Sequence, residues 1–261
     1  EYLTTNDTSY ISSTIIDGTN LINEDIIGVI NGEDSTTLIS GFSLKNGNFT
    51  TLGRSGVLVG SSSNVTLDHL IIENIYSDGQ GPGIFINGNS VVNITNCIIR
   101  NNQSATNGGG IYIENSEVNI NYCEVKNNLS NNQSGHGGGI SIWNNSLVKI
   151  KYSKISNNSS HTGGGIYAYQ SVNELKFSEI TKNIATLDGG GFTSSNNSSQ
   201  LINVTLSNNI APLGADLLAA HSGTNISILN SIVWSPIGTI GSPLINVSYL
   251  KCQEYFADLN Q

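Results

Sequence analysis

The feature that most constrains the fold of this chain is a glycine cluster that returns at a nearly constant interval. The clusters are GPG once and GGG four times, and each is followed by a large apolar residue. These apolar residues lie 27, 29, 26 and 26 positions apart: Ile84, Ile111, Ile140, Ile166 and Phe192. A fixed interval between about 20 and 50 residues is typical of stacked repeats.

Within each repeat, the apolar residues alternate with polar ones. Ile111 and Ile113 are separated by Tyr112, and Val118 and Ile120 by Asn119, which is the period of a strand rather than a helix. A propeller blade needs about 40 residues, so a shorter repeat favours one coil of a parallel β-helix. The sequence therefore predicts an all-β solenoid of about nine coils with a period near 26 residues, whose stacked aliphatic side chains form the core.

The same pattern predicts a single β-helix domain over residues 1–261. Residues 1–50 form irregular early coils, 51–233 the regular glycine-triplet coils, and 234–261 a last coil followed by a tail. Two alternatives remain open for that tail. It either covers the open end of the stack, as terminal repeats do, or pairs with the next molecule to give a head-to-tail fibre.

Asparagines recur at the predicted corners, two residues after the apolar residue that closes each short strand run. Stacked amides hydrogen-bond along a spine of strands, so we expect a ladder here, interrupted by Lys182. The alternative is a series of ordinary polar turns. The predicted ladder residues are Asn74, Asn101, Asn127, Asn157 and Asn208.

The coil pattern I-x-x-N-N, GGGI and V-x-I-x-x-C/S-x-I resembles the right-handed parallel β-helix repeats of bacterial surface proteins, including the polymorphic outer-membrane protein type. The chain departs from that type in having GGG instead of GGA, and Ile, Val or Leu instead of Phe. The resemblance covers residues from about Thr4 to Val233. It implies a right-handed helix and an extracellular or cell-surface location, but fold alone does not transfer function.

Pectin-lyase-like enzymes share this architecture and carry clustered carboxylates with a basic residue. The two arginines here, Arg54 and Arg100, lie nearly two periods apart, and neither lies beside an aspartate pair. The sequence therefore predicts no lyase or hydrolase site, no catalytic residue and no cofactor. The net charge of -9, with ten Lys and Arg residues, argues against nucleic acid. The absence of an apolar run of about eighteen residues argues against a transmembrane segment.

Aromatic side chains gather at outward positions of the strands that follow the glycine clusters. Such a face would stack on sugar rings or contact another subunit. The alternative is that single exposed aromatics only satisfy β-propensity. The candidate ligand-binding residues are Phe85, Tyr112, Trp143, Tyr167 and Tyr169.

Polar residues immediately precede three of the glycine triplets, and two of them are titratable. His136, Thr162 and Asp188 should stack at one corner, with His161 beside them, which suggests acid–base or metal chemistry. Corners favour small polar residues in any case, and we predict no metal site.

Two of the three cysteines, Cys97 and Cys123, occupy the same position in successive coils. They should be stacked neighbours, so either a disulfide or two unpaired buried thiols is consistent with the pattern.

These expectations favour an extracellular structural or adhesive surface protein, a rigid rod that self-associates or binds a surface or matrix partner. The main rival is a protein that binds or cleaves polysaccharide along its aromatic face.

Overall fold

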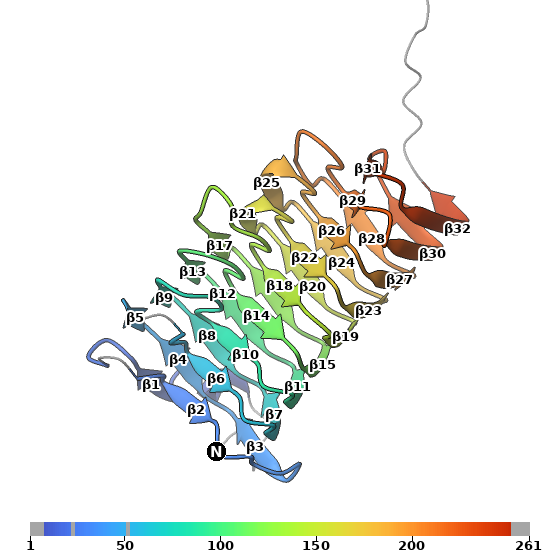
Figure 1. The fold of residues 1–261 in the computed structure, drawn as a ribbon. Coiled ribbons are helices and arrows are strands. Elements are labelled where there is room, and N and C mark those ends of the chain that lie inside the picture. Colours follow the sequence, from blue (N-terminus) through green and yellow to red (C-terminus); the bar gives the residue numbers. More distant parts are fainter. Residues whose placement is uncertain (1–7, 22–23, 51–52, 252–261) are drawn as a thin grey trace, which may run out of the picture.

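The computed structural model describes residues 8–21, 24–50 and 53–251, and nearly all of this part is β-structure. Within these residues, one short 3-10 turn, η1 (Thr8–Tyr10), is followed by thirty-two strands, whose pairings are all parallel. Figure 1 shows these strands as three faces of a stack of coils that lie along one axis. No described helix is long and apolar enough to cross a membrane.

Sheet A has seventeen strands, and most coils contribute two consecutive strands to it. Its strands are β1 (Ile15–Asp17), β3 (Thr37–Ser40), β4 (Ser43–Lys45), β7 (Asn64–Asp68), β8 (Ile71–Glu73), β11 (Val91–Thr95), β12 (Ile98–Arg100), β15 (Glu117–Asn121), β16 (Glu124–Lys126), β19 (Leu147–Lys151), β20 (Lys154–Ser156), β23 (Val172–Lys176), β24 (Glu179–Thr181), β27 (Ser198–Ile202), β28 (Thr205–Ser207), β30 (Asn225–Val233) and β32 (Leu244–Lys251).

Sheet B has nine strands, one from each coil. Five of them, β10, β14, β18, β22 and β26, begin directly after a GPG or GGG cluster. Its strands are β2 (Ile27–Val29), β6 (Val57–Val59), β10 (Ile84–Ile86), β14 (Ile111–Glu114), β18 (Ile140–Trp143), β22 (Ile166–Tyr169), β26 (Phe192–Ser195), β29 (Leu217–Ala220) and β31 (Gly238–Ile240).

Sheet C has six short strands and lies before the glycine corner of each coil. Its strands are β5 (Asn48–Phe49), β9 (Tyr76–Ser77), β13 (Gln103–Ser104), β17 (Leu129–Ser130), β21 (Ser159–Thr162) and β25 (Ile184–Asp188). From β2 to β31 the chain completes about eight laps of about 27 residues, close to the predicted period.

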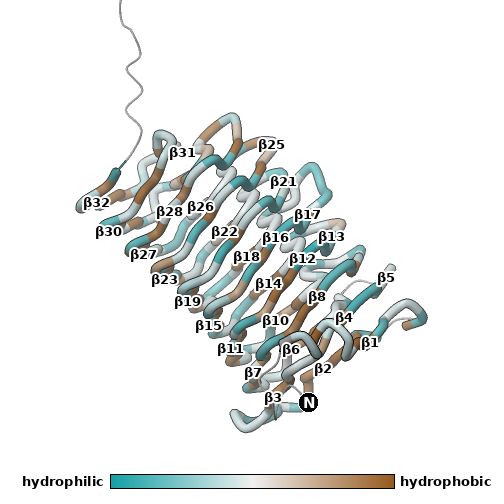
Figure 2. Tube along the Cα trace, turned by 180° about the vertical axis from the view of Figure 1, so that it is seen from behind, coloured by the Kyte–Doolittle hydropathy of each residue, from teal (hydrophilic) through white to brown (hydrophobic). Residues whose placement is uncertain are grey.

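The core is a set of vertical columns of aliphatic side chains. Ile111 pairs in register with Ile140, and Ile140 with Ile166, and all three are fully buried. The predicted stacking of like on like is thus confirmed. Burying each such side chain contributes roughly 1.5–3 kcal/mol, so the columns are the main source of stability. Figure 2 shows hydrophobic segments recurring from strand to strand along the stack.

The glycine corners pack so closely that a side chain would collide with the next coil. A Cβ atom on Gly139 would lie 2.7 Å from the carbonyl oxygen of Gly165 and 2.9 Å from Asn158 Nδ2. The first glycine of the same triplet, Gly137, has a φ of 67°, which other residues rarely adopt. Close approach and left-handed backbone together explain the repeated triplet.

The core becomes partly polar toward the C-terminal coils. Asn173 and Ser199 continue a column that holds Val118 and Val148 in earlier coils, and both are buried. Asn173 Nδ2 lies 3.4 Å from Ser199 Oγ, which is within 3.2 Å of Ser194 Oγ. These side chains therefore bond to one another inside the stack, although Asn173 Oδ1 is buried without a partner among the described residues.

The predicted last coil is present as β30 to β32. Strand β32 pairs with β30, but its apolar residues are only partly covered: Val247, which lies over Ile228, is 46% exposed. The predicted tail falls on residues 252–261, with Tyr255 and Phe256, and lies outside the described residues.

Candidate functional site

An asparagine ladder runs through the stack, but one residue further along than predicted. Asn74, Asn101, Asn127, Asn157 and Asn208 are exposed, and their φ angles of 56–57° place them in the left-handed region. They make the turn, as asparagine does well. Ile75 follows Asn74, but the residues after the other four turn asparagines and after Lys182 point inward and form the ladder: Asn102, Asn128, Asn158, Asn183 and Asn209.

Each inner rung of the ladder bonds to the coil before it and to the coil after it. Asn128 Nδ2 donates to Asn158 Oδ1 at 3.0 Å, and Asn158 Nδ2 to Asn183 Oδ1 at 3.0 Å. The same oxygens accept backbone N–H groups, as when Asn128 N donates to Asn158 Oδ1 at 2.9 Å. The amides thus satisfy the buried corner backbone that no strand partner reaches.

The predicted aromatic residues lie on the outer side of sheet B, but they form two groups rather than one ladder. Phe85 packs on Tyr112 with ring centroids 5.3 Å apart, and Trp143 lies 5.2 Å from Tyr167 and 5.3 Å from Tyr169. Ser141 separates Tyr112 from Tyr167 in the column, which breaks the stack.

Two of these five aromatics are largely covered. Tyr112 is 5% and Tyr167 8% exposed, because the left-handed first glycines of the corners, Gly108 and Gly163, lie against their Cβ atoms. Burial raises the pKa of Tyr167 to about 12 and that of Tyr112 further still. The surface that a ligand reaches is therefore smaller than the sequence suggests, and centres on half-buried Trp143 and Tyr169.

The predicted corner cluster is brought together beside this aromatic group. His136 bridges to Thr162 and Thr162 pairs with Asp188, so the three lie in one column. The His136 ring is 4.3 Å from that of Tyr167 and meets Trp143 edge-on at 5.5 Å. Burial, and to a lesser degree His161, lowers the pKa of His136.

Asp188 is the least well satisfied member of this corner. Within the described residues its Oδ1 atom is buried without a hydrogen-bond partner, and burial raises the pKa of its carboxyl. His161 instead contacts Thr186, with Nδ1 2.9 Å from Oγ1. Among the described residues no group of three or more His, Cys, Asp or Glu side chains is arranged to hold a metal ion. Arg54 pairs with Asp25 and Arg100 with Glu73, so both arginines are engaged in ion pairs.

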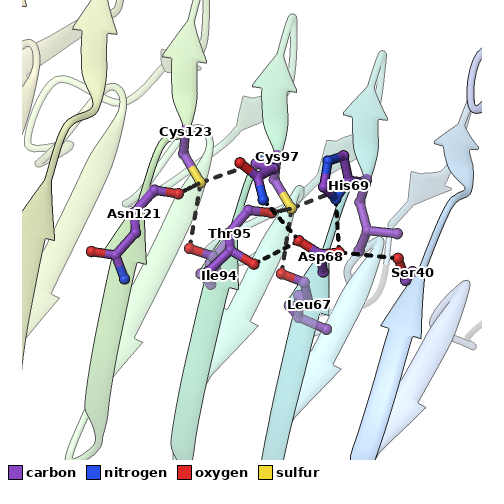
Figure 3. A network of polar contacts seen from close by, with 11 residues as sticks. Ser40, Leu67, Asp68, His69, Ile94, Thr95, Cys97, Asn121 and Cys123 are labelled. Atoms are coloured by element: carbon purple, nitrogen blue, oxygen red, sulfur yellow. Dashed lines mark hydrogen bonds and ion pairs between the residues drawn. The ribbon is translucent and has the colours of Figure 1, made fainter. Parts of the chain in front are cut away.

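Cys97 and Cys123 stack in successive coils and are buried. Both are free thiols, so the structure has the second of the two predicted alternatives and not a disulfide. Leu70 N donates to Cys97 Sγ at 3.4 Å and Cys97 N to Cys123 Sγ at 3.5 Å, as Figure 3 illustrates in part. Burial raises the pKa of the Cys97 thiol. The thiols thus act as backbone acceptors, the role that Ser153 takes in the next coil.

Figure 3 also shows a polar network around Asp68, beside the first thiol. Asp68 accepts hydrogen bonds from Thr95 Oγ1 at 2.7 Å and Asn96 Nδ2 at 3.1 Å, and it contacts His69 Nδ1 at 2.7 Å. Burial raises the pKa of this carboxyl, but these bonds outweigh it, and the net pKa is lowered. Ser40 Oγ in the preceding coil also donates to Asp68, at 3.3 Å, so the network joins three coils at the turn between the two strands of sheet A.

That turn carries an exposed aromatic stack that was not predicted from the sequence. Tyr122 and Tyr152 have ring centroids 5.0 Å apart at an interplanar angle of 6°, and Tyr152 and Phe177 are 5.1 Å apart at 5°. Their exposed fractions are 60%, 49% and 48%. We call these three residues the turn ridge. The signal that could have found it is the recurrence of an aromatic residue directly before the small Cys or Ser of this corner.

The turn ridge is built on unfavourable backbone. All three residues have φ between 50° and 56°, whereas other coils place Asn96, Asn203 or Asn230 at this turn. A bulky residue in the left-handed region costs roughly 1–3 kcal/mol. Each ring pair returns only about 0.5–1.5 kcal/mol. Stacking within the fold therefore does no more than offset the strain.

Comparison with known proteins supports the β-helix architecture and gives no information on function. No curated protein and no solved structure matches this chain significantly. The family model described as right-handed β-helix region matches residues 2–137, just over half of the chain. With its parallel coils and stacked columns, the chain belongs to the right-handed β-helix family.

Proposed function

We propose that this protein is a rigid structural or adhesive rod of an extracellular surface or matrix, and not an enzyme. The observation that carries the proposal is one unbroken core column along sheet B, whose members are all fully buried. Its members are Val57, Ile84, Ile111, Ile140, Ile166, Phe192 and Leu217. Bending the rod would separate these contacts in every coil, so the architecture favours stiffness over conformational change.

The end formed by β32 supports head-to-tail association of such rods. Val247 and Ile245 on β32 continue core columns, and Val247 is 46% exposed. An edge strand with apolar side chains and open backbone groups is a template for another strand. A second copy that stacks its first coil there would bury both.

Electron microscopy of the native material, with sedimentation of the purified protein, tests this proposal. We expect fibres or end-to-end rods, and shorter assemblies for Val247→Asp. The control Val172→Asp changes an exposed residue on the side of the rod and should leave assembly unchanged. A protein that stays monomeric at all concentrations and attaches to no cell surface or matrix would contradict the proposal.

Carbohydrate binding on sheet B is the second candidate. Trp143 and Tyr169 are half-buried rings on the outer face, and Trp143 contacts the His136 ring. Asp188, whose Oδ1 is buried without a partner in the described part of the chain, lies in the same corner column as His136. Pockets that combine aromatic side chains with a few polar groups are typical of ligand sites. Incubation with acidic and neutral glycans tests it: binding that is lost in Trp143→Ala and Tyr169→Ala, or cleavage that is lost in Asp188→Asn, would favour this function over the rod.

A further inference from the structure

One coil carries an inserted loop just before its glycine corner. Six residues separate Ser130 from Gly137, whereas two residues separate Ser160 from Gly163 in the next coil. The extra length forms the inserted loop, Asn131–Gly135, whose first four residues are exposed. A loop that projects from a regular stack depends on a few contacts for its position, so these contacts decide whether it stays in place.

The inserted loop is fastened at its last residue and at the histidine that follows. The carbonyl oxygen of Gly135 accepts hydrogen bonds from His161 N at 3.2 Å and Thr162 N at 3.1 Å. His136 N donates to Asn107 Oδ1 at 2.9 Å. The loop is thus tied to the coil after it through Gly135 and to the coil before it through His136.

The hydrogen bonds of His136 fix the tautomer of its ring. Its backbone N–H can only donate, so the Asn107 atom that it contacts is the carbonyl oxygen. The same oxygen lies 3.2 Å from His136 Nδ1, which must therefore carry the proton of the neutral ring. The other nitrogen, Nε2, is the basic one, and no described residue forms a hydrogen bond with it.

The surroundings of His136 disfavour a second ring proton. The ring is half-buried, with its centroid 4.3 Å from that of Tyr167 and 5.5 Å from that of Trp143. His161, on the next coil, is a second base, so its charge repels a charge on His136. Burial is the larger effect, and together the two lower the pKa of His136.

Two carboxylates lie on nearby coils, and neither forms an ion pair with His136 in the described part of the chain. Asp188 stands in the same corner column, two coils further along. Burial raises the pKa of Asp188, so acid also removes its charge. Glu114 lies in register with Trp143 and accepts a hydrogen bond from Asn144 Nδ2 at 2.8 Å. A proton added to His136 therefore creates a charge without a counter-ion in contact.

We propose that His136 is an acid-sensitive latch that holds the inserted loop closed. When Nε2 takes up a proton from solvent, the charged ring leaves its place against Tyr167 and Trp143, because a charge is better hydrated outside. Gly135 then loses its fixed position, and both aromatic rings become more exposed. The latch is a property of one corner, and it depends on neither fibre formation nor sugar binding.

The direction of the pH dependence follows from burial. In the open loop the pKa of His136 returns toward its ordinary value of 6.5, whereas in the closed loop it is lower. The closed state is therefore fully favoured above that ordinary value and is lost as pH falls through the lowered one.

Hydrogen exchange of the full chain at about pH 7.5 and about pH 5 measures the opening, with protection factors corrected for the intrinsic exchange rate. The reporters are the amides of His161 and Thr162, which donate to Gly135. We expect their protection to fall at least about threefold at the lower pH in the parent. The amide of Ile140, which donates to Gly165 in the core, should keep its protection and so separates loop opening from general unfolding.

Two variants assign the effect to one histidine. His136→Phe keeps a ring at this place but cannot be charged, so we expect its reporter amides to be equally protected at both pH values. His221→Asn removes a histidine from a different coil, at a left-handed position that asparagine accepts, and should respond to pH as the parent does.

Three results would overturn the proposal: unchanged protection in the parent, the same fall in His136→Phe, or an NMR titration that gives His136 a pKa at or above 6.5. If His136→Phe does not fold, the parent alone decides. The loss of protection must then follow the titration of the His136 ring, and a loss that follows another group rejects the latch.

Discussion

Asn209 Nδ2 donates to Asp216 Oδ1 at 2.7 Å, so the asparagine ladder ends on a fully buried carboxylate. The other oxygen of Asp216 accepts hydrogen bonds from Ser235 N at 2.7 Å and Ser235 Oγ at 2.8 Å. A ladder of identical amides needs an acceptor at one end that is not itself an amide. Asp216 supplies this acceptor and joins the regular coils to the last one.

The inward asparagines, and not the preceding turn asparagines, should control stability. Asn158→Ala leaves the Asn128 backbone N–H and the Val125 carbonyl without partners. We expect a loss of about 3 kcal/mol, because each unsatisfied buried group costs roughly 1–3 kcal/mol. Denaturant unfolding measures it, with Asn157→Gly as the matched control, which should change stability little. A larger loss for the control would place the ladder where the sequence first suggested.

Glycine triplets should tolerate no side chain at their third position. Gly139→Ala forces a Cβ against the carbonyl of Gly165, and we expect a loss of about 1–3 kcal/mol or more. Gly28 lies in sheet B, and a Cβ added there would meet no atom within 4 Å, so Gly28→Ala should be neutral or stabilise by about 0.4–1 kcal/mol. Thermal unfolding of the two variants makes the comparison, and equal effects would show that close packing is not the constraint.

At the position of Cys123, which stacks on Cys97, serine should preserve stability and valine should lower it. In Cys123→Ser the hydroxyl replaces Sγ as acceptor for Cys97 N, as Ser178 Oγ does for Ser153 N at 3.2 Å, so stability should change by less than about 1 kcal/mol. Cys123→Val leaves that N–H unpaired and should cost about 1–3 kcal/mol. Urea unfolding under reducing conditions compares the stabilities of the two variants. If Cys123→Val were as stable as the parent, the thiol would not be needed as a hydrogen-bond acceptor.

Glu73 should make stability depend on acid pH. Burial raises the pKa of this carboxyl, but Lys45 at 2.8 Å and Arg100 at 2.6 Å outweigh it, so the net pKa lies below its ordinary value of 4.5. A lowered folded-state pKa gives stability that is present above the unfolded-state value and is lost as pH falls through the folded-state value.

The midpoint of denaturant unfolding, followed from pH 7 to pH 3, tests this pH dependence. Below about pH 4.5 the parent should lose stability more steeply than Glu73→Gln, which starts about 1–3 kcal/mol less stable at pH 7. As a control at pH 7, Glu179→Gln removes an exposed ion pair with Lys154 and should change stability by less than about 1 kcal/mol. Parallel curves for the parent and Glu73→Gln would show that the ion pairs are not coupled to folding.

The fold was predictable because its cause is local and repeated. Ile111, Ile140 and Ile166 follow the glycines at a fixed interval, and an alternating pattern places them inward in every coil. The ladder was predicted one residue early, because both asparagines of each pair suit a corner. The second asparagine of each pair points inward, and this series runs without interruption from Asn102 to Asn209, because Asn183 continues it. The first series, at the turn positions, is interrupted by Lys182.

The candidate sites were less predictable, because they depend on what the corners cover. Alternation places Tyr112 outward, but no sequence pattern shows that left-handed glycines pack over its Cβ. The turn ridge was missed for the opposite reason. Its aromatic residues stand at a left-handed turn, where propensity predicts asparagine or glycine, so only the assembled coils show that Tyr122, Tyr152 and Phe177 meet.

The small polar cluster formed by Asn173, Ser194 and Ser199 inside the C-terminal coils helps to fix which coil stacks on which. Coils with the same aliphatic columns would fit one another after slipping by a whole lap. A slip that set Asn173 against Ile226 instead of Ser199 would remove the hydrogen bond from its Nδ2 to Ser199 Oγ and leave only the one to Ser171 Oγ, at a cost of about 0.5–1.5 kcal/mol. At this place neighbouring coils thus recognise each other through polar chemistry as well as through shape.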